Sequence, residues 1–178
     1  QTLEEAANTV APGADGLFAL PHLLGERTPQ ANPLAKGVLF GLTNAHTAGH
    51  MYRPLLEGVA YALRDSYESS ALPLSRLVIS GGGSNCLLWR QIIADVLNQE
   101  LTYLPQGDNA MGTAYLAGRG LGLFDSFRIV RDRWLGDGER IVPNPAEVER
   151  YDRRFAYYQS LNALCRPAFE ELARLDLR

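Results

Sequence analysis

The clearest pattern of apolar positions lies in the middle of the chain. Apolar residues fill positions 77–79, glycines fill positions 81–83, and apolar positions 89, 92, 93, 96 and 97 then repeat with the period of an α-helix. A second strand-like segment follows at positions 101–104. This order predicts a right-handed parallel strand–helix–strand crossover. Ser84 or Asn85 is available as the N-cap of its helix.

The N-terminal side shows two helical and two strand-like patterns. Residues 2–10 and about 47–70 have helical periodicity, whereas residues 17–20 and 37–43 are typical of strands. Prolines and glycines between the two strands predict an ordered loop. Pro54 removes a hydrogen-bond donor from the second helix, which predicts a late helix start or a kink.

The C-terminal side begins with a turn at 106–109 and a helix rich in small residues. Residues 120–145 carry many turn residues and are predicted to be irregular, and a helix is expected from Glu147 onward. Pro167 is predicted to kink or interrupt that helix. With no repeat or flexible linker, we expect a connecting helix and turn (1–15), an α/β core (16–126), and a turn-rich segment with a C-terminal helix (127–178).

Composition narrows the functional classes. Hydrophobic residues make up 46% and charged residues 21% of the 178 residues, as in a globular domain. A net charge of −3 gives no broad basic surface for nucleic acid or an anionic membrane, so neither partner is expected. Cys86 and Cys165 form no disulfide framework or zinc motif, which favours a cytoplasmic location and no metal site within the chain.

The triple glycine Gly81, Gly82 and Gly83 is the first candidate for a ligand-binding site. Glycines at the carboxyl end of a parallel strand let a ligand approach the backbone, and the following helix offers unpaired N–H groups. The turn matches neither the dinucleotide motif nor the phosphate loop, and no lysine follows it. Spacing alone leaves two equal interpretations, a nucleotide cradle and a tight structural turn.

Several further motifs occur in one order along the chain. They are FALPHLLGERTP at 18–29, GVLFGLT at 37–43, LLEGVAYALRD at 55–65, and ISGGG at 79–83 followed by WRQ at 89–91. Together they resemble the FGGY carbohydrate kinases, with the xylulokinase branch most similar, over about residues 16–122. The resemblance implies an α/β, ribonuclease-H-like (actin-like ATPase) fold. It also implies that the chain is a partial C-terminal nucleotide-binding domain of a two-domain enzyme.

The activity that this resemblance implies is transfer of the γ-phosphoryl group of ATP, with Mg²⁺, to a hydroxyl of a small sugar. Xylulose or a related ketose or polyol is the expected substrate. The implied nucleotide-binding residues are Gly81, Gly82, Gly83, Asn85 and Cys86, which lie on the adenosine side of the cleft. Cys86 stands where many relatives have Ser or Asn, and it is a weaker hydrogen-bonding residue. Asn85 either takes over that contact or caps the helix.

Two other positions also leave alternatives open. Asp108 resembles an acidic turn near the adenine, or it is a helix cap. Arg27 lies in a loop that resembles a cleft-side loop of relatives, or it makes a structural salt bridge. His22, His46 and His50 share no metal-ligand spacing and are expected to be surface or packing residues.

The family's catalytic and metal-orienting aspartates and its phosphate turn belong to sequence that precedes Gln1. We therefore expect the natural N-terminus to be missing, and we expect no catalytic residue or Mg²⁺ ligand in this chain. The isolated chain should be inactive, with an unpaired sheet edge that favours self-association into homo-oligomers. A non-catalytic nucleotide-sensing or interaction module is the alternative. A chaperone-like or actin-like relative is disfavoured by the motifs at 25–29 and 56–59.

Overall fold

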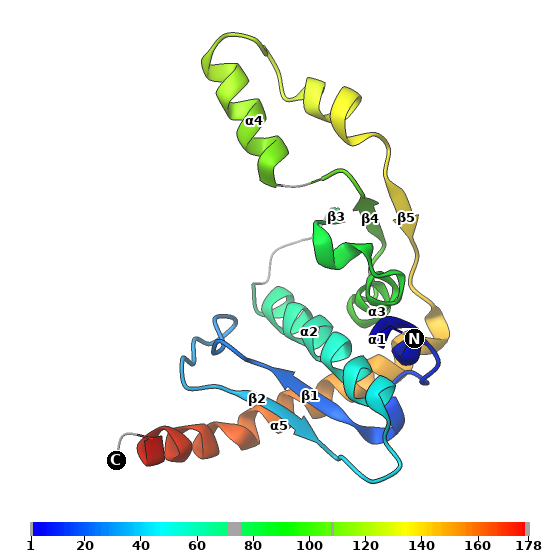
Figure 1. Cartoon of the computed structure of the whole chain (residues 1–178), viewed down its shortest axis with the longest axis vertical. Helices are drawn as coiled ribbons and strands as arrows, with labels where there is room; N and C mark the ends of the chain where they lie inside the picture. The colour runs from blue at the N-terminus through cyan, green and yellow to red at the C-terminus, as the bar shows by residue number, and fades with distance from the viewer. Residues whose placement is uncertain (1, 71–75, 108, 177–178) are drawn as a thin grey trace.

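The computed structural model describes residues 2–70, 76–107 and 109–176, which form two small sheets flanked by helices (Figure 1). The helices are α1 (Leu3–Asn8), α2 (Ala48–Ser70), α3 (Leu87–Leu97), α4 (Asn109–Gly120) and α5 (Pro145–Asp176). The strands are β1 (Phe18–Pro21), β2 (Gly37–Phe40), β3 (Leu77–Ser80), β4 (Leu101–Leu104) and β5 (Glu139–Ile141). Shorter helical turns are η1 (Ala14–Gly16), η2 (Gly82–Asn85) and the π-helical η3 (Val130–Leu135).

The first sheet pairs β1 with β2 in antiparallel orientation. Phe18 lies opposite Phe40, and Pro21 lies opposite Gly37. Strand β1 is almost wholly buried because it lies against α2, whereas β2 is largely exposed. Both predicted strands are therefore confirmed, although the second ends at Phe40.

The second sheet has the order β3–β4–β5. Strands β3 and β4 are parallel and α3 connects them, which confirms the predicted crossover. Strand β5 adds antiparallel to β4, with Ile141 opposite Leu101. The expectation that residues 120–145 are irregular is therefore wrong for β5 and η3. The pattern missed β5 because only Ile141 of its three residues is buried.

Helix α2 is continuous through its proline. It begins at Ala48, well before Pro54, so the prediction of a late start is wrong. Pro54 has no N–H group and so removes one hydrogen bond from the helix. Its side chain is fully buried, and this packing offsets the loss.

Helix α5 also runs on through a proline, Pro167, so the predicted interruption is wrong. It begins at Pro145, where proline is favoured because the first helical N–H group has no partner inside the helix. The Asn144 Oδ1 atom accepts a hydrogen bond from the Ala146 N–H group at 3.2 Å. Tyr151, Phe155 and Tyr158 form the buried stripe of this helix.

A buried carboxylate joins the N-terminal turn to α2 and α5. Oε1 of Glu57 accepts hydrogen bonds from the Gly13 N–H group at 2.9 Å, from Arg53 Nε at 2.9 Å and from the Tyr151 hydroxyl at 3.1 Å. These bonds tie α2 to the N-terminal turn and to α5.

Helix α4 and the segment after it project from the body of the molecule (Figure 1). They carry an aromatic cluster in which Tyr115 stacks on Phe124 and Phe127, and Trp134 meets Phe124 edge-on. None of the helices in the described residues is both long and apolar enough to cross a membrane.

Candidate functional site

The glycine turn follows β3 directly and has a defined shape. Gly81 adopts φ 89° and ψ 176°, a backbone conformation that is essentially confined to glycine. The Ser84 hydroxyl donates to the Gly81 carbonyl at 2.6 Å and closes the turn. The side chain of Ser84 is thus used internally, and the backbone of the turn is fixed.

Glycine occupies each of the three positions for a different structural reason. A Cβ atom on Gly83 would lie 2.6 Å from the Trp89 ring, so Gly83 is required for packing. A Cβ atom on Gly82 would have no protein atom within 4 Å. Gly81 is explained by its backbone angles and Gly83 by Trp89, whereas Gly82 faces open space. Gly82 is therefore the glycine best suited to let a ligand approach.

Cys86, and neither Ser84 nor Asn85, is the N-cap of α3. Its Sγ atom accepts a hydrogen bond from the Trp89 N–H group at 3.3 Å. The predicted cap is wrong because Ser84 and Asn85 belong to the helical turn η2, which delays the start of α3 to Leu87. Burial raises the pKa of the Cys86 thiol, and the neighbouring Glu4 carboxylate adds to that rise.

A pocket of about 380 Å³ lies beside this turn, between the start of α3 and helices α1 and α2. We call it the turn pocket; its lining residues are Glu4, Tyr52, Leu56, Val59, Gly82, Gly83, Asn85, Cys86 and Trp89. It brings together four of the five residues predicted to bind nucleotide, all except Gly81.

Glu4 and Tyr52 are lining residues that the sequence did not reveal. They sit on helices far from the glycine turn in the chain, and no local motif marks them. Glu4 is the one charged side chain in the lining, and Tyr52, Leu56, Val59 and Trp89 give the pocket an apolar wall. This mixture suits a flat, neutral group with hydroxyls and ring nitrogens better than it suits a phosphate.

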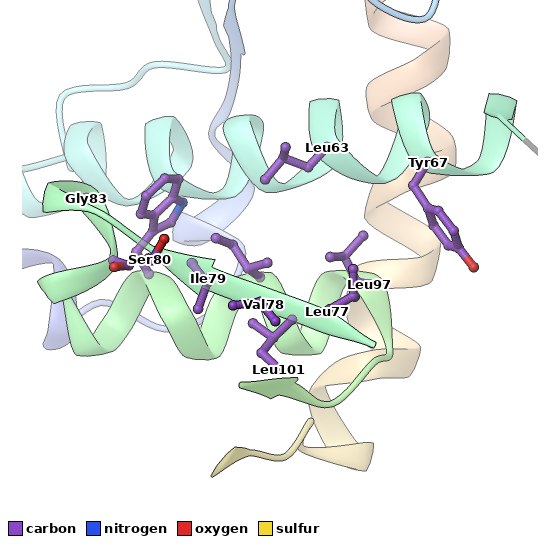
Figure 2. Close-up of a pocket in the computed structure, with 12 residues that line it drawn as sticks. Leu63, Tyr67, Leu77, Val78, Ile79, Ser80, Gly83, Leu97 and Leu101 are labelled. Carbon is purple, nitrogen blue, oxygen red and sulfur yellow. The ribbon is translucent and has the colours of Figure 1, made fainter. Parts of the chain in front are cut away.

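A larger groove of about 600 Å³ runs along β3, between α2 and α3 (Figure 2). Leu63, Leu97 and Leu101 are among its mainly apolar lining, and Gly83 and Trp89 border both this groove and the turn pocket. Within the described residues β3 pairs with β4 alone, and Val78 on β3 is 49% exposed. The expected unpaired edge is therefore present at β3.

The loop with Arg27 is held by its neighbour Glu26. Glu26 is buried, accepts a hydrogen bond from Asn162 at 3.1 Å and lies 3.6 Å from the Arg166 guanidinium. Arg27 is exposed and forms no ion pair with any residue that the structure describes, whereas its neighbour Glu26 pairs with Arg166. Asp108 lies outside the described residues.

The three histidines occupy packing and turn positions. His22 is buried, and burial lowers its pKa. His46 and His50 each accept a hydrogen bond from a threonine N–H group, and His50 Nε2 lies 3.2 Å from Asp15. No group of three or more His, Cys, Asp or Glu residues in the described ranges could hold a metal ion.

Comparison with known proteins agrees with this geometry. The model of the FGGY family of carbohydrate kinases, C-terminal domain, matches residues 1–121. The xylulose kinase of Bacillus subtilis (strain 168) is 30% identical over 165 residues, which cover 90% of this chain and 33% of that protein. The gluconokinase of Bacillus licheniformis is 33% identical over 177 residues, which cover 96% of this chain and 34% of that protein.

Solved structures show the same likeness. The xylulose kinase from Rhodospirillum rubrum superposes with a TM-score of 0.77 at 36% identity, covering 94% of this chain and 34% of that one. The gluconate kinase from Lactobacillus acidophilus gives a TM-score of 0.79 at 25% identity, covering 96% and 35%.

These matches establish the structural class of the protein. The α/β fold is the ribonuclease-H-like fold of the actin-like ATPases, as found in the C-terminal domains of sugar kinases. The chain belongs to the FGGY family of carbohydrate kinases. It spans about one third of the length of the relatives it matches.

Proposed function

We propose that the full-length protein is an ATP-dependent sugar kinase and that this chain supplies the adenosine side of its cleft. The observation that carries the proposal is the open space at Gly82, in a pocket that also contains Asn85 and Cys86 at the end of β3. Xylulose or a related ketose or polyol is the proposed substrate. Gluconokinases among the relatives add gluconate to the compounds worth testing.

The lining of the turn pocket supports a nucleoside as its occupant. The apolar wall around Leu56 and Trp89 offers a surface for a purine ring, and the Glu4 carboxylate can accept hydrogen bonds from ribose hydroxyls. Neither Lys nor Arg lines the pocket, and Glu4 would repel a phosphate. The phosphates of ATP are therefore proposed to point away from this chain's pocket.

The remaining catalytic parts are proposed to lie outside this chain. Phosphoryl transfer to a sugar depends on positioning, on neutralising charge with Mg²⁺ and on a carboxylate that accepts the sugar hydroxyl's proton. The described residues supply no acidic cluster that fits Mg²⁺. We propose that residues 1–178 are a partial C-terminal domain, with a connecting segment at 1–15, a core at 16–126 and a C-terminal part at 127–178. The missing domain would supply the base and the metal ligands.

A cytoplasmic location is part of the same proposal. Cys86 and Cys165 are both free and half-buried, as expected of a protein kept under reducing conditions.

The test is a phosphorylation assay of the full-length protein with ATP and Mg²⁺ against ketoses, polyols and gluconate. We expect ADP release that depends on one of these compounds. The 178-residue chain alone should release no ADP in the same assay. If the full-length protein consumes no ATP with any sugar, the kinase assignment is wrong.

A nucleotide-sensing module without catalysis is the second candidate. The observation that favours it is Cys86, whose sulfur already caps α3 and offers a nucleotide little hydrogen bonding. ATP binding by the full-length protein, together with absence of turnover for every sugar, would support this candidate over the kinase.

A further inference from the structure

We propose that Tyr103 on β4 is a positioning residue for the turn pocket. Through one hydrogen bond it holds the Asn85 side chain so that the Asn85 NH₂ group is left to donate to a bound nucleoside. The inference rests on the proposed function, because it concerns how the same pocket recognises ATP. Tyr103 is not among the lining residues, so it acts through Asn85 alone.

The contact between the two residues crosses from the sheet to the glycine turn. The Tyr103 hydroxyl donates to Asn85 Oδ1 at 2.8 Å, and Tyr103 is only 9% exposed. Asn85 is exposed and lines the turn pocket. Because the amide oxygen is taken by Tyr103, the Asn85 NH₂ group keeps its hydrogens for another acceptor. Nothing in the described part of the chain accepts them.

Tyr103 is itself held in place from β5. The Arg90 guanidinium lies over the Tyr103 ring, 3.8 Å from the centroid, and Arg90 Nη1 donates to Glu139 at 3.2 Å. Arg90 is 4% exposed, so this stack is shielded from water. The attraction between a cation and an aromatic face is stronger when water is excluded. A line of contacts thus runs from Glu139 through Arg90 and Tyr103 to Asn85.

Asn85 matters because the other polar side chains of the turn are already used. The Ser84 hydroxyl donates to the Gly81 carbonyl, and the Cys86 sulfur accepts from the Trp89 N–H group. An oriented Asn85 NH₂ group supplies the donor that the ring nitrogens of a purine or the oxygens of ribose can accept. The Glu4 carboxylate, on α1, supplies an acceptor in the same pocket. This pairing of a fixed donor with an acceptor fits a nucleoside.

The test uses Tyr103→Phe in the full-length protein, because that change removes the hydroxyl and keeps the ring beneath Arg90. We expect the KM for ATP to rise about five-fold, the usual effect of losing one neutral hydrogen bond, with kcat and the KM for sugar unchanged. Tyr158→Phe is the matched control. It removes the hydroxyl of another buried tyrosine, one that does not line the pocket, and should leave the KM for ATP unchanged.

A double-mutant cycle separates positioning from packing. If Tyr103 acts only through Asn85, adding Tyr103→Phe to Asn85→Ala should raise the KM for ATP no further. Two additive effects would overturn the inference, as would a Tyr103→Phe protein that melts at a lower temperature with an unaltered KM for ATP. These outcomes require a wild-type protein that uses ATP, so they are distinct from a failure of the kinase assignment.

Discussion

The hydroxyl of Tyr151 on α5 donates a hydrogen bond to Oε1 of Glu57 on α2 at 3.1 Å, between residues 94 positions apart in the chain. Glu57 is 1% exposed, so its carboxylate is stabilised by hydrogen bonds from protein groups and not by water. Burial, and then the Glu57 carboxylate, raise the pKa of Tyr151, which therefore remains a hydrogen-bond donor at all ordinary pH values. The other Glu57 oxygen, Oε2, lies 3.9 Å from the Arg154 guanidinium.

Glu57→Ala should destabilise the protein strongly. The change leaves the buried Arg53 charge without its partner, and breaking a buried ion pair costs about 3–5 kcal/mol. Urea denaturation would measure the loss. Glu68→Ala is the control, because Glu68 pairs with Arg64 at the surface and its loss should cost about 1 kcal/mol or less. Equal losses in the two variants would contradict the structural role of Glu57.

Gly82→Val and Gly83→Ala should separate ligand binding from packing. A side chain on Gly82 enters open space, so Gly82→Val should raise the KM for ATP much more than that for sugar and leave the melting temperature unchanged. A methyl group on Gly83 meets the Trp89 ring, so Gly83→Ala should cost about 1–3 kcal/mol of stability. Kinetic assays and thermal melts of both variants check this. A Gly82→Val protein with normal ATP kinetics would exclude Gly82 from the binding surface.

Cys86→Ser should improve the start of α3. Serine is among the best N-cap residues, whereas a thiol is a weak acceptor, so we expect a gain of about 0.5–1 kcal/mol in unfolding free energy. The hydroxyl would also offer the nucleotide a better hydrogen-bonding partner, which predicts a lower KM for ATP. Cys165→Ser, on α5 away from the turn pocket, should bring neither gain. A Cys86→Ser protein less stable than the wild type would show that the sulfur is needed for packing.

Stability should fall at mildly acidic pH because of His22. Burial lowers the pKa of His22 below 6.5; Arg166 acts in the same direction, and Glu26 and Asp65 oppose it. As the pH drops below 6.5, the unfolded chain takes up the proton before the folded one does, so the free energy of unfolding decreases until the folded pKa is passed. Urea midpoints compared from about pH 8 to about pH 5.5 should drop further for the wild type than for His22→Gln. Equal drops would assign the pH dependence to other groups.

Much of the fold follows from local patterns. The strand–glycine–helix–strand order around Gly81 needs only nearby residues, and the ordered motifs make the family recognisable from the sequence. Strand β5 was missed because three residues carry too little alternation, and it forms only because the edge of β4 accepts it. Pro54 was expected to delay or kink its helix and Pro167 to kink or interrupt its own, but both helices continue through these prolines.

The site was also predictable only in part, because local patterns mark some of its residues and tertiary packing brings in the others. Gly82, Asn85 and Cys86 lie within one short stretch of the sequence, at 82–86, so a motif could mark them. Glu4 and Tyr52 reach the turn pocket through the packing of α1 and α2, which no local pattern describes. The cap of α3 was misplaced because the helical turn η2 could not be distinguished from the start of the helix.

The position of the partners of Glu57 bears on how the chain folds. Gly13 and Tyr151 lie 44 and 94 positions from Glu57 in the chain, whereas Arg53 lies one turn away on the same helix. A partly folded form without α5 would keep the Glu57 carboxylate in the interior with one of its donors missing, which makes such a form costly. We therefore expect the N-terminal turn, α2 and α5 to fold in one cooperative transition, whose rate is limited by the long search that brings α5 back to α2.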